Sequence, residues 1–301
     1  MRLRLLPEPA ASRRQAAVVA EHVDLLRDDH GFEVVGADVE CDVALASGPE
    51  GASALTEVRA RVRAWLVQDL DASSPGDERP TPWSTPAHVI AAAPWIAERI
   101  ADLRGGGPPP LVRPGIDKTQ LAAPARATID LDGPLRVLVV ADEDSGWEDA
   151  LRVAAGMREP HVVTLLQEGV VARDASPDRT VGPLTARETQ SLLRGHDVIL
   201  RMARNEALPH ALLRAFHAGM TCVTLPLADH AEVVVHGFNG LVSSYDDDRG
   251  GARALDLLAR DRSLLGYLRE NAAATARGWP SCRQAAAMLA LALRRLAMSA
   301  C

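Results

Sequence analysis

The sequence predicts an α/β protein built from two doubly wound, Rossmann-like domains in tandem. Short runs rich in Val, Leu and Ala alternate with segments whose apolar residues recur at helical spacing, as in parallel strands joined by helices. This alternation begins near the N-terminus and starts afresh at PLRVLVVAD (134–142). A chain of 301 residues also has room for two domains of about 150 residues each.

The first domain is expected to span 1–117. A strand at 2–6 precedes a helix at 12–29, and later helices are expected at 51–62 and 94–104. The remaining strands are expected in the brief apolar runs FEVVG (32–36), DVALAS (42–47), AWLVQDL (64–70), AHVIAAA (87–93) and PLVRP (110–114).

The second domain is expected to span 135–278, after a linker at 118–134 in which all periodicity is lost. Its expected elements are helices at 146–157, 185–195 and 209–218 and strands at 161–166, 197–202 and 222–227. A last helix at 281–299 has no strand after it, so this C-terminal segment (279–301) must dock on another part of the protein.

Composition excludes several classes of function. The net charge is −7 with acids and bases interspersed, which argues against nucleic acid as a partner. There is no apolar run of about 18 residues, and the N-terminus lacks a signal-peptide core, so we expect a cytoplasmic protein without a transmembrane segment. Four widely spaced cysteines (41, 222, 282 and 301) indicate reduced packing residues, not a zinc site or disulfide framework.

The segment ARNEALPHALLRAFHAG (203–219) places charge at the start of an otherwise apolar helix. In a doubly wound domain, ligands bind outside the carboxyl ends of the strands, where unpaired N–H groups at helix N-termini favour an anion or a sugar phosphate. Residues 201–209 therefore lie on the expected binding rim. Alternatively, Glu206 only caps the helix while Arg201 and Arg204 face water.

Residues 180–247 resemble the donor half of retaining glycosyltransferases of GT-B fold, the large family of bacterial mannosyl-, glucosyl- and rhamnosyltransferases that also resembles glycogen synthase. Three pieces carry the resemblance, namely 181–198, 206–219 and 232–242, which ends in HGFNGLV. A weaker likeness covers 65–76, 88–100, 110–120 and 278–296. It implies two domains facing a cleft and a C-terminal helix that crosses back onto the N-terminal domain.

The resemblance also implies roles for individual residues. Glu206 would contact hydroxyls of the donor sugar, and the backbone after it would meet the sugar and the β-phosphate. Arg214 stands where the family has a ribose-binding Glu, and because arginine cannot accept a hydrogen bond, ribose recognition must differ here. Glu232 would have a positioning role. The donor-binding candidates are Gly182, Arg201, Arg204, Asn205, Ala207, Leu208, Pro209, His210, Arg214 and Glu232, with Glu206 as a catalytic candidate.

The chain departs from the family after the first strand of the second domain. The family places an Arg and a Lys there to neutralise the diphosphate, whereas VVADEDSGW (139–147) has three acids and no base. Arg201 and Arg204 are candidates to compensate, because guanidinium groups suit phosphate oxygens. Alternatively, they pair with Asp142 or Asp144 or face water.

On the acceptor side, Gln68 and Asp69 stand where many family members have a His-Asp step. Gln68 would hydrogen-bond a sugar hydroxyl, and Asp69, the second catalytic candidate, would orient or deprotonate the acceptor. The histidines show no metal-ligand spacing, and the acidic runs at 142–144 and 246–248 fit solvated loops. We therefore expect no metal and no cofactor apart from the nucleotide-sugar substrate.

The resemblance thus predicts a glycosyltransferase that moves a hexosyl or deoxyhexosyl group, with retention, from a nucleotide-sugar to a small-molecule or carrier-bound acceptor. The degenerate donor motifs leave an alternative, a non-catalytic GT-B-fold partner or regulatory subunit that binds nucleotide, glycan or another transferase. A nucleotide-sugar epimerase of the same fold is a further alternative, but this sequence lacks the constellation of His and acidic residues expected for one. Homo-oligomerisation is left open.

Overall fold

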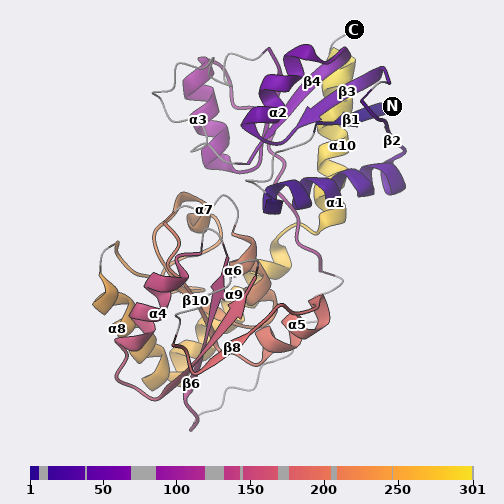
Figure 1. Ribbon diagram of the computed structural model, residues 1–301. Helices are drawn as coiled ribbons and strands as arrows, with labels where there is room; N and C mark the ends of the chain where they lie inside the picture. Colours follow the sequence, from indigo (N-terminus) through magenta and orange to yellow (C-terminus); the bar gives the residue numbers. More distant parts are fainter. Residues whose placement is uncertain are drawn as a thin grey trace. The chain divides into compact units, whose positions relative to one another are not determined.

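The computed structural model divides the chain into two compact units (Figure 1). Unit 1 comprises Met1–Ile116 and Pro280–Cys301, and unit 2 comprises Asp117–Trp279. Each unit is an α/β fold around one parallel sheet, which confirms the predicted fold class. The residues that the structure describes are 1–6, 13–37, 39–68, 86–118, 132–142, 145–168, 176–204, 209–245 and 247–299. Most of the expected linker therefore lies outside the described residues.

Unit 1 contains a five-stranded parallel sheet in the order β2-β1-β3-β4-β5. Its strands are β1 (Arg2–Leu5), β2 (Glu33–Val34), β3 (Cys41–Ala46), β4 (Ala60–Val67) and β5 (His88–Ala91). Its helices are α1 (Arg13–His30), α2 (Pro49–Ala54), the 3-10 turn η2 (Leu55–Glu57), α3 (Pro94–Arg104) and α10 (Cys282–Ser299).

Both faces of the unit 1 sheet are covered, as a parallel sheet requires. Along β3, Val43 and Leu45 pack on one face with residues of α1 and α10, while Ala44 and Ala46 pack on the other with residues of α3. Figure 1 shows α1 and α10 side by side. The last helix therefore returns to the N-terminal unit, as the resemblance implied.

The return of the chain is fixed by backbone pairing between Ile116 and the segment before α10. The Ile116 N–H donates to the Pro280 carbonyl at 3.1 Å, and the Cys282 N–H donates to the Ile116 carbonyl at 3.2 Å. A Cβ at Gly115 would lie 2.5 Å from backbone atoms of Ser281. Only glycine therefore fits at this crossing of the two segments.

The expected helix at 51–62 is wrong in its second half. The structure ends α2 at Ala54 and begins β4 at Ala60, four residues before the expected strand. In β4, Val62 and Ala64 are buried while Arg61 and Arg63 lie on the other, more exposed face. That alternation has a period of two, so it belongs to a strand even though the residue types also suit a helix. The expected strand at 110–114 is reduced to one bridge between Leu111 and Ala91.

A buried histidine makes unit 1 sensitive to acid. His22 of α1 is 3% exposed, and its Nε2 accepts a hydrogen bond from the Gly115 N–H at 3.3 Å. Burial lowers its pKa from 6.5 to about 4. Between these values the unfolded chain binds a proton that the folded chain does not, so stability falls as the pH drops. We expect a loss of about 3 kcal/mol between pH 7 and pH 4 from this group.

The measurement is urea unfolding at several pH values for the wild type and His22→Gln. The glutamine retains an acceptor for the Gly115 N–H but does not titrate, so its stability curve should lack this component. If the free energy of unfolding depends on pH in the same way in both proteins, His22 is not the source of the acid sensitivity.

Unit 2 contains a six-stranded parallel sheet in the order β11-β10-β9-β6-β7-β8. Its strands are β6 (Leu135–Ala141), β7 (His161–Gln167), β8 (Arg179–Val181), β9 (Val198–Arg201), β10 (Thr221–Thr224) and β11 (Leu241–Val242). Its helices are α4 (Trp147–Ala155), α5 (Ala186–Arg194), α6 (His210–His217), α7 (Ala228–Ala231), α8 (Asp248–Arg260) and α9 (Arg262–Gly278).

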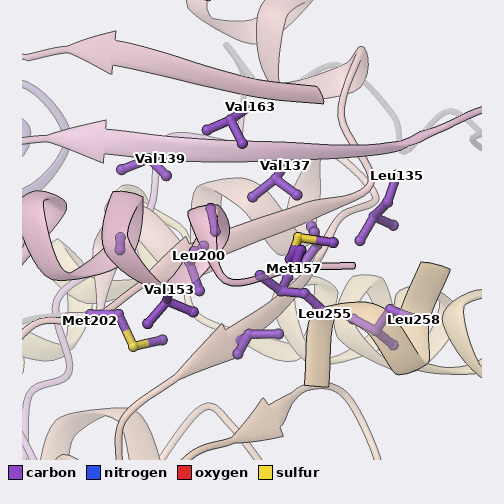
Figure 2. Packing of buried hydrophobic residues seen from close by; sticks show 14 of the residues in the cluster. Leu135, Val137, Val139, Val153, Met157, Val163, Leu200, Met202, Leu255 and Leu258 are labelled. Carbon is purple, nitrogen blue, oxygen red and sulfur yellow. The ribbon is translucent and has the colours of Figure 1, made fainter. Parts of the chain in front are cut away.

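One face of this sheet carries an apolar core of unit 2. Val137 and Val139 of β6 pack with Val153 of α4 and Leu255 of α8, and Figure 2 shows these side chains between the strands and the helices. Because alternate residues of β6 face this core, the strand is held in one register. Within the described part of the chain, no helix is both long and apolar enough to cross a bilayer.

Candidate functional site

The carboxyl edge of the unit 2 sheet brings the polar candidates of this unit together. Ala141 pairs with Gln167, and Arg201 pairs with Thr224, so the strands β6, β7, β9 and β10 end at the same edge. The polar residues Asp142 and Glu168 follow β6 and β7 directly, and Arg201 closes β9. Ligands of doubly wound folds bind at this edge.

Arg201 forms a buried ion pair with Asp142. Its Nη1 and Nη2 lie 3.2 Å from the two carboxylate oxygens, and the residues are 1% and 5% exposed. Such a bidentate geometry holds the guanidinium plane in one orientation. Of the alternatives left open by the sequence, pairing with Asp142 is the one that the structure contains for Arg201. This pair also neutralises one of the acids that follow β6.

The turn after β6 allows this close approach of two strand ends. The Asp142 N–H donates to Ser145 Oγ at 3.1 Å, and Gly146 has a φ of +60° at the start of α4. A side chain on Gly146 would collide with the Met202 carbonyl directly after β9. Glycine is therefore required here both for its backbone conformation and for space.

Arg204 lies on the same rim but remains accessible. Its side chain is 53% exposed, and its Nε lies 3.5 Å from a carboxylate oxygen of Asp149 in α4. Asp149 also pairs with Arg152. A pair this long and exposed contributes little stability, so it does not by itself keep the guanidinium from a ligand.

Arg214 is held by an acid that the sequence analysis did not single out. Its two terminal nitrogens lie 3.2 and 3.3 Å from the carboxylate oxygens of Glu168, and both side chains are partly exposed. Where the resemblance implied a carboxylate on the helix, the structure has an arginine on α6 with a carboxylate supplied from the end of β7. The available signal was that Glu168 is the first acid after the buried run of β7.

Helix α6 begins at the carboxyl edge with Pro209 as its N-cap and half-buried His210 as its first residue. The Leu213 N–H donates to the Pro209 carbonyl at 2.9 Å. The neighbouring candidates Asn205, Glu206, Ala207 and Leu208, together with Asp69 of the first unit and Asp144, lie outside the described residues.

The HGFNGLV segment has a clear structural role. Asn239 is 1% exposed, accepts from the Val235 N–H at 2.7 Å and donates to the Val233 carbonyl at 2.8 Å and to Thr275 Oγ1 at 2.9 Å. A Cβ on Gly240 would lie 2.5 Å from Cys222 Sγ. This turn therefore fixes the loop that follows Glu232, which lies half-buried at the C-terminus of α7.

Gly182 follows the edge strand β8 with a φ of +124°, and a Cβ there would lie 2.6 Å from the Gln167 carbonyl. Its close packing on the end of β7 accounts for the residue type without a ligand. In unit 1, Gln68 follows β4 at the carboxyl edge of that sheet and is 2% exposed. No described residue donates a hydrogen bond to its Oε1.

Metal-ligand groupings are not found among the described residues. No three His, Cys, Asp or Glu side chains in that part of the chain are placed to hold a metal ion. Cys41, Cys222 and Cys282 are buried and form no disulfide among the described residues, and burial raises the pKa of Cys41 and Cys222. The thiols of Cys41 and Cys222 are therefore poor ligands and nucleophiles at neutral pH.

Neither a protein-family model nor a curated protein sequence matches the chain. Solved structures match its fold over nearly its whole length. The Anabaena protein HepE, solved with UDP and glucose, has a TM-score of 0.71 and 14% identity over 98% of this chain and 100% of its own. Sucrose-phosphate synthase from Thermosynechococcus elongatus has a TM-score of 0.68 and 12% identity over 97% of this chain and 81% of its own.

A glycosyltransferase from Rickettsia africae has a TM-score of 0.68 and 10% identity, with 98% of each chain covered. At these identities the matches show the fold, and their coverage of this chain includes both units. The chain has the two-domain GT-B fold.

Proposed function

We propose that this protein is a glycosyltransferase that uses a nucleotide-sugar donor and transfers the sugar, with retention, to a small-molecule or carrier-bound acceptor in the cytoplasm. The observation that carries the proposal is the set of groups at the carboxyl edge of the unit 2 sheet, with Arg204, the Arg214–Glu168 pair and the start of α6 beside the Arg201–Asp142 pair. Support also comes from HepE, a protein of the same fold that has been solved with UDP-glucose.

Each group would have a distinct task. The N–H groups at the start of α6 and the accessible guanidinium of Arg204 would hold the diphosphate, whose negative charge grows as the bond to the sugar breaks. Arg201 would not bind the diphosphate itself but would hold the Asp142 carboxylate away from it. Glu168, oriented by Arg214, would accept hydrogen bonds from the ribose hydroxyls, which arginine alone cannot do.

The remaining roles follow the resemblance. Glu206 would bind hydroxyls of the donor sugar, while His210 and the backbone of 207–209 would lie beside the sugar and the β-phosphate. Glu232 would position the adjoining loop, and Gln68 and Asp69 of unit 1 would bind and orient the acceptor. In the reaction, the bond from the anomeric carbon to the diphosphate oxygen breaks and a bond to the acceptor oxygen forms. The acceptor proton would pass to the departing diphosphate, with no protein nucleophile and no metal.

Binding of nucleoside diphosphates tests the first part of the proposal. We expect one of UDP, GDP, TDP and CDP, with its sugar conjugates, to raise the melting temperature by several degrees, because a ligand at a hundred times its Kd adds about 2.7 kcal/mol. Arg204→Ala should weaken binding of the nucleoside diphosphate about tenfold or more, since one charge-assisted contact is lost. Binding of the free nucleoside should change little. Arg260→Ala, an exposed arginine on α8, is the matched control.

Ribose recognition is tested by comparing the preferred nucleotide with its 2′-deoxy form. The wild type should bind the ribonucleotide more tightly, and Glu168→Ala should remove that preference while Glu168→Gln retains part of it. An unchanged preference in Glu168→Ala would exclude the carboxylate from ribose binding.

Turnover separates the enzyme from the alternative, a non-catalytic partner or regulatory subunit. The acids after β6 and the engagement of Arg201 by Asp142 favour that alternative. Slow release of the free sugar from the donor in the absence of acceptor, followed by NMR, would support the enzyme, and the configuration of the transferred sugar tests retention. A nucleotide that binds but stays intact, or no binding by any nucleotide, would support the alternative.

A further inference from the structure

Unit 2 contains a pocket under helix α5. Its volume is about 540 Å³, and it is enclosed by α5, the turn after it and the strands β6, β7 and β8. This volume lies in the range of small-molecule sites. Arg136, at the start of β6, lines it, and five residues of strand separate Arg136 from the carboxyl edge, which corresponds to about 16 Å. The Arg136 end of the pocket is therefore well separated from the candidate donor site, while Val181, at its other end, pairs with Leu166, two residues before Glu168.

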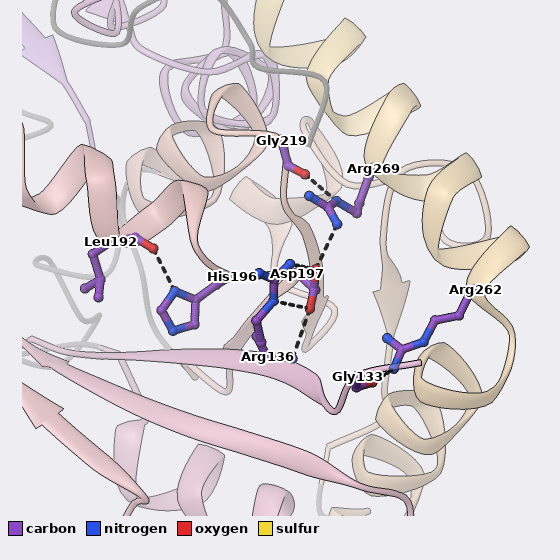
Figure 3. A network of polar contacts seen from close by, with 8 residues as sticks. All are labelled: Gly133, Arg136, Leu192, His196, Asp197, Gly219, Arg262 and Arg269. Carbon is purple, nitrogen blue, oxygen red and sulfur yellow. Dashed lines mark hydrogen bonds and ion pairs between the residues drawn. The ribbon is translucent and has the colours of Figure 1, made fainter. Parts of the chain in front are cut away.

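Two guanidinium groups line the pocket. Arg136 is anchored, because its Nε and Nη2 bond the Asp197 carboxylate at 2.9 and 2.7 Å while its side chain remains 35% exposed (Figure 3). Arg179, at the start of the edge strand β8, is exposed and forms no ion pair with any residue that the structure describes. One arginine is therefore fixed in place, and the other is available to a ligand.

The acids around the pocket are already engaged. Asp197 is shared between Arg136 and Arg269, and the Glu188 carboxylate accepts from the Thr185 N–H and hydroxyl at the start of α5. Among the charged side chains that line the pocket, Arg136 and Arg179 are positive and Glu188 is negative, so one net positive charge remains. A singly charged anion would balance it.

His196 adds a titratable group to the wall. It is 7% exposed, and because its Nδ1 lies 2.7 Å from the Leu192 carbonyl, which can only accept, this nitrogen carries the proton. Burial, with the charges of Arg136 and Arg179, lowers its pKa, against the Leu192 carbonyl and Asp197, which raise it. The ring is therefore neutral at pH 7, and a bound anion would raise its pKa.

The remaining walls of the pocket are largely apolar. Val162 and Val181 lie on the strands, and Leu184 and Leu192 flank them from α5 and the segment before it. Apolar walls with a few convergent polar groups are typical of sites for small organic molecules. A bare inorganic ion would leave these walls in contact with water.

We propose that this pocket binds a small organic monoanion, a carboxylate carried on an apolar body, with the carboxylate on Arg179 and Arg136 and the body against the valine and leucine side chains. A planar carboxylate matches the guanidinium fork of Arg179. The proposal is independent of the donor site, because it needs no nucleotide.

The test uses hexanoate, benzoate and phenyl phosphate as probes, with inorganic phosphate for comparison. Binding is followed by calorimetry and by the NMR titration of His196 in the full chain. We expect the carboxylates to bind more tightly than inorganic phosphate, to raise the pKa of His196 and to bind equally well when the preferred nucleotide is present.

Arg179→Ala should weaken carboxylate binding about tenfold or more, whereas Arg187→Ala, an exposed arginine on α5 outside the pocket, should leave it unchanged. Ser191→Trp, which changes an exposed residue of α5 at the pocket, should block binding without loss of the fold. Absence of carboxylate binding, equal effects of the two arginine variants, or tighter binding of phenyl phosphate than of benzoate would overturn the proposal.

Discussion

Replacing Asp197 with alanine is expected to lower the free energy of unfolding by about 3–5 kcal/mol, because it removes the carboxylate that two arginines share. Asp197 is 2% exposed and accepts from the Arg136 backbone and side chain and, at 2.8 Å, from Arg269 (Figure 3). Arg269 is 4% exposed, so without Asp197 its charge would be buried with only the Gly219 carbonyl as a described partner. Urea unfolding followed by circular dichroism measures the loss.

Asp261→Ala is the matched control, because that aspartate is exposed and caps α9 through the Leu264 N–H. Removing a helix cap costs about 1 kcal/mol. A loss at Asp197 no larger than this would contradict the role of the network.

The same network predicts a pH dependence. Burial on its own would raise the pKa of Asp197, but hydrogen bonds from Arg136 and the charges of Arg136 and Arg269 outweigh it, so the pKa lies below 3.8. The carboxylate therefore contributes stability that is present above this value and is lost as the pH falls through the lower folded-state pKa.

The parts of the fold that the sequence predicts are those governed by local periodicity. The buried runs that became β3, β6, β7 and β9 could be identified because each is bounded by polar or turn residues. The three-residue edge strand β8 is too short to show any period. Helices α8 and α9 are not among the predicted elements, although their sequences have the amphipathic pattern of a helix.

The site was less predictable, because its pairs join residues far apart in the chain. Arg214 meets Glu168 across 46 positions and Arg201 meets Asp142 across 59, so no spacing rule relates either pair. What brings them together is the strand order, which places the ends of β7, β6 and β9 at one edge. The sequence identified Arg201 and a set of possible acidic partners, but which acid pairs with it depends on that strand order.

Breaking the Arg201–Asp142 pair is expected to cost about 3–5 kcal/mol when either partner alone is replaced by alanine, because a buried charge is left without its counter-ion. The double variant should lose clearly less than the sum of the single losses, since neither charge then remains. A double-mutant cycle by urea unfolding measures the coupling. Arg201→Lys should rescue only part of the stability, because an ammonium cannot reproduce the two 3.2 Å contacts.

Nucleotide affinity decides whether Arg201 serves the fold or the diphosphate. If Asp142 already occupies the guanidinium, Asp142→Asn, which keeps the shape of the side chain, should destabilise the protein and change the affinity for the diphosphate only through the loss of one nearby negative charge. Arg201→Ala would then weaken diphosphate binding less than Arg204→Ala does, although Arg201→Ala lowers the free energy of unfolding far more. In the reverse case, Arg201→Ala would weaken diphosphate binding by the folded protein more than Arg204→Ala does. That result would assign the phosphate contact to Arg201, with Asp142 as the residue that orients its guanidinium.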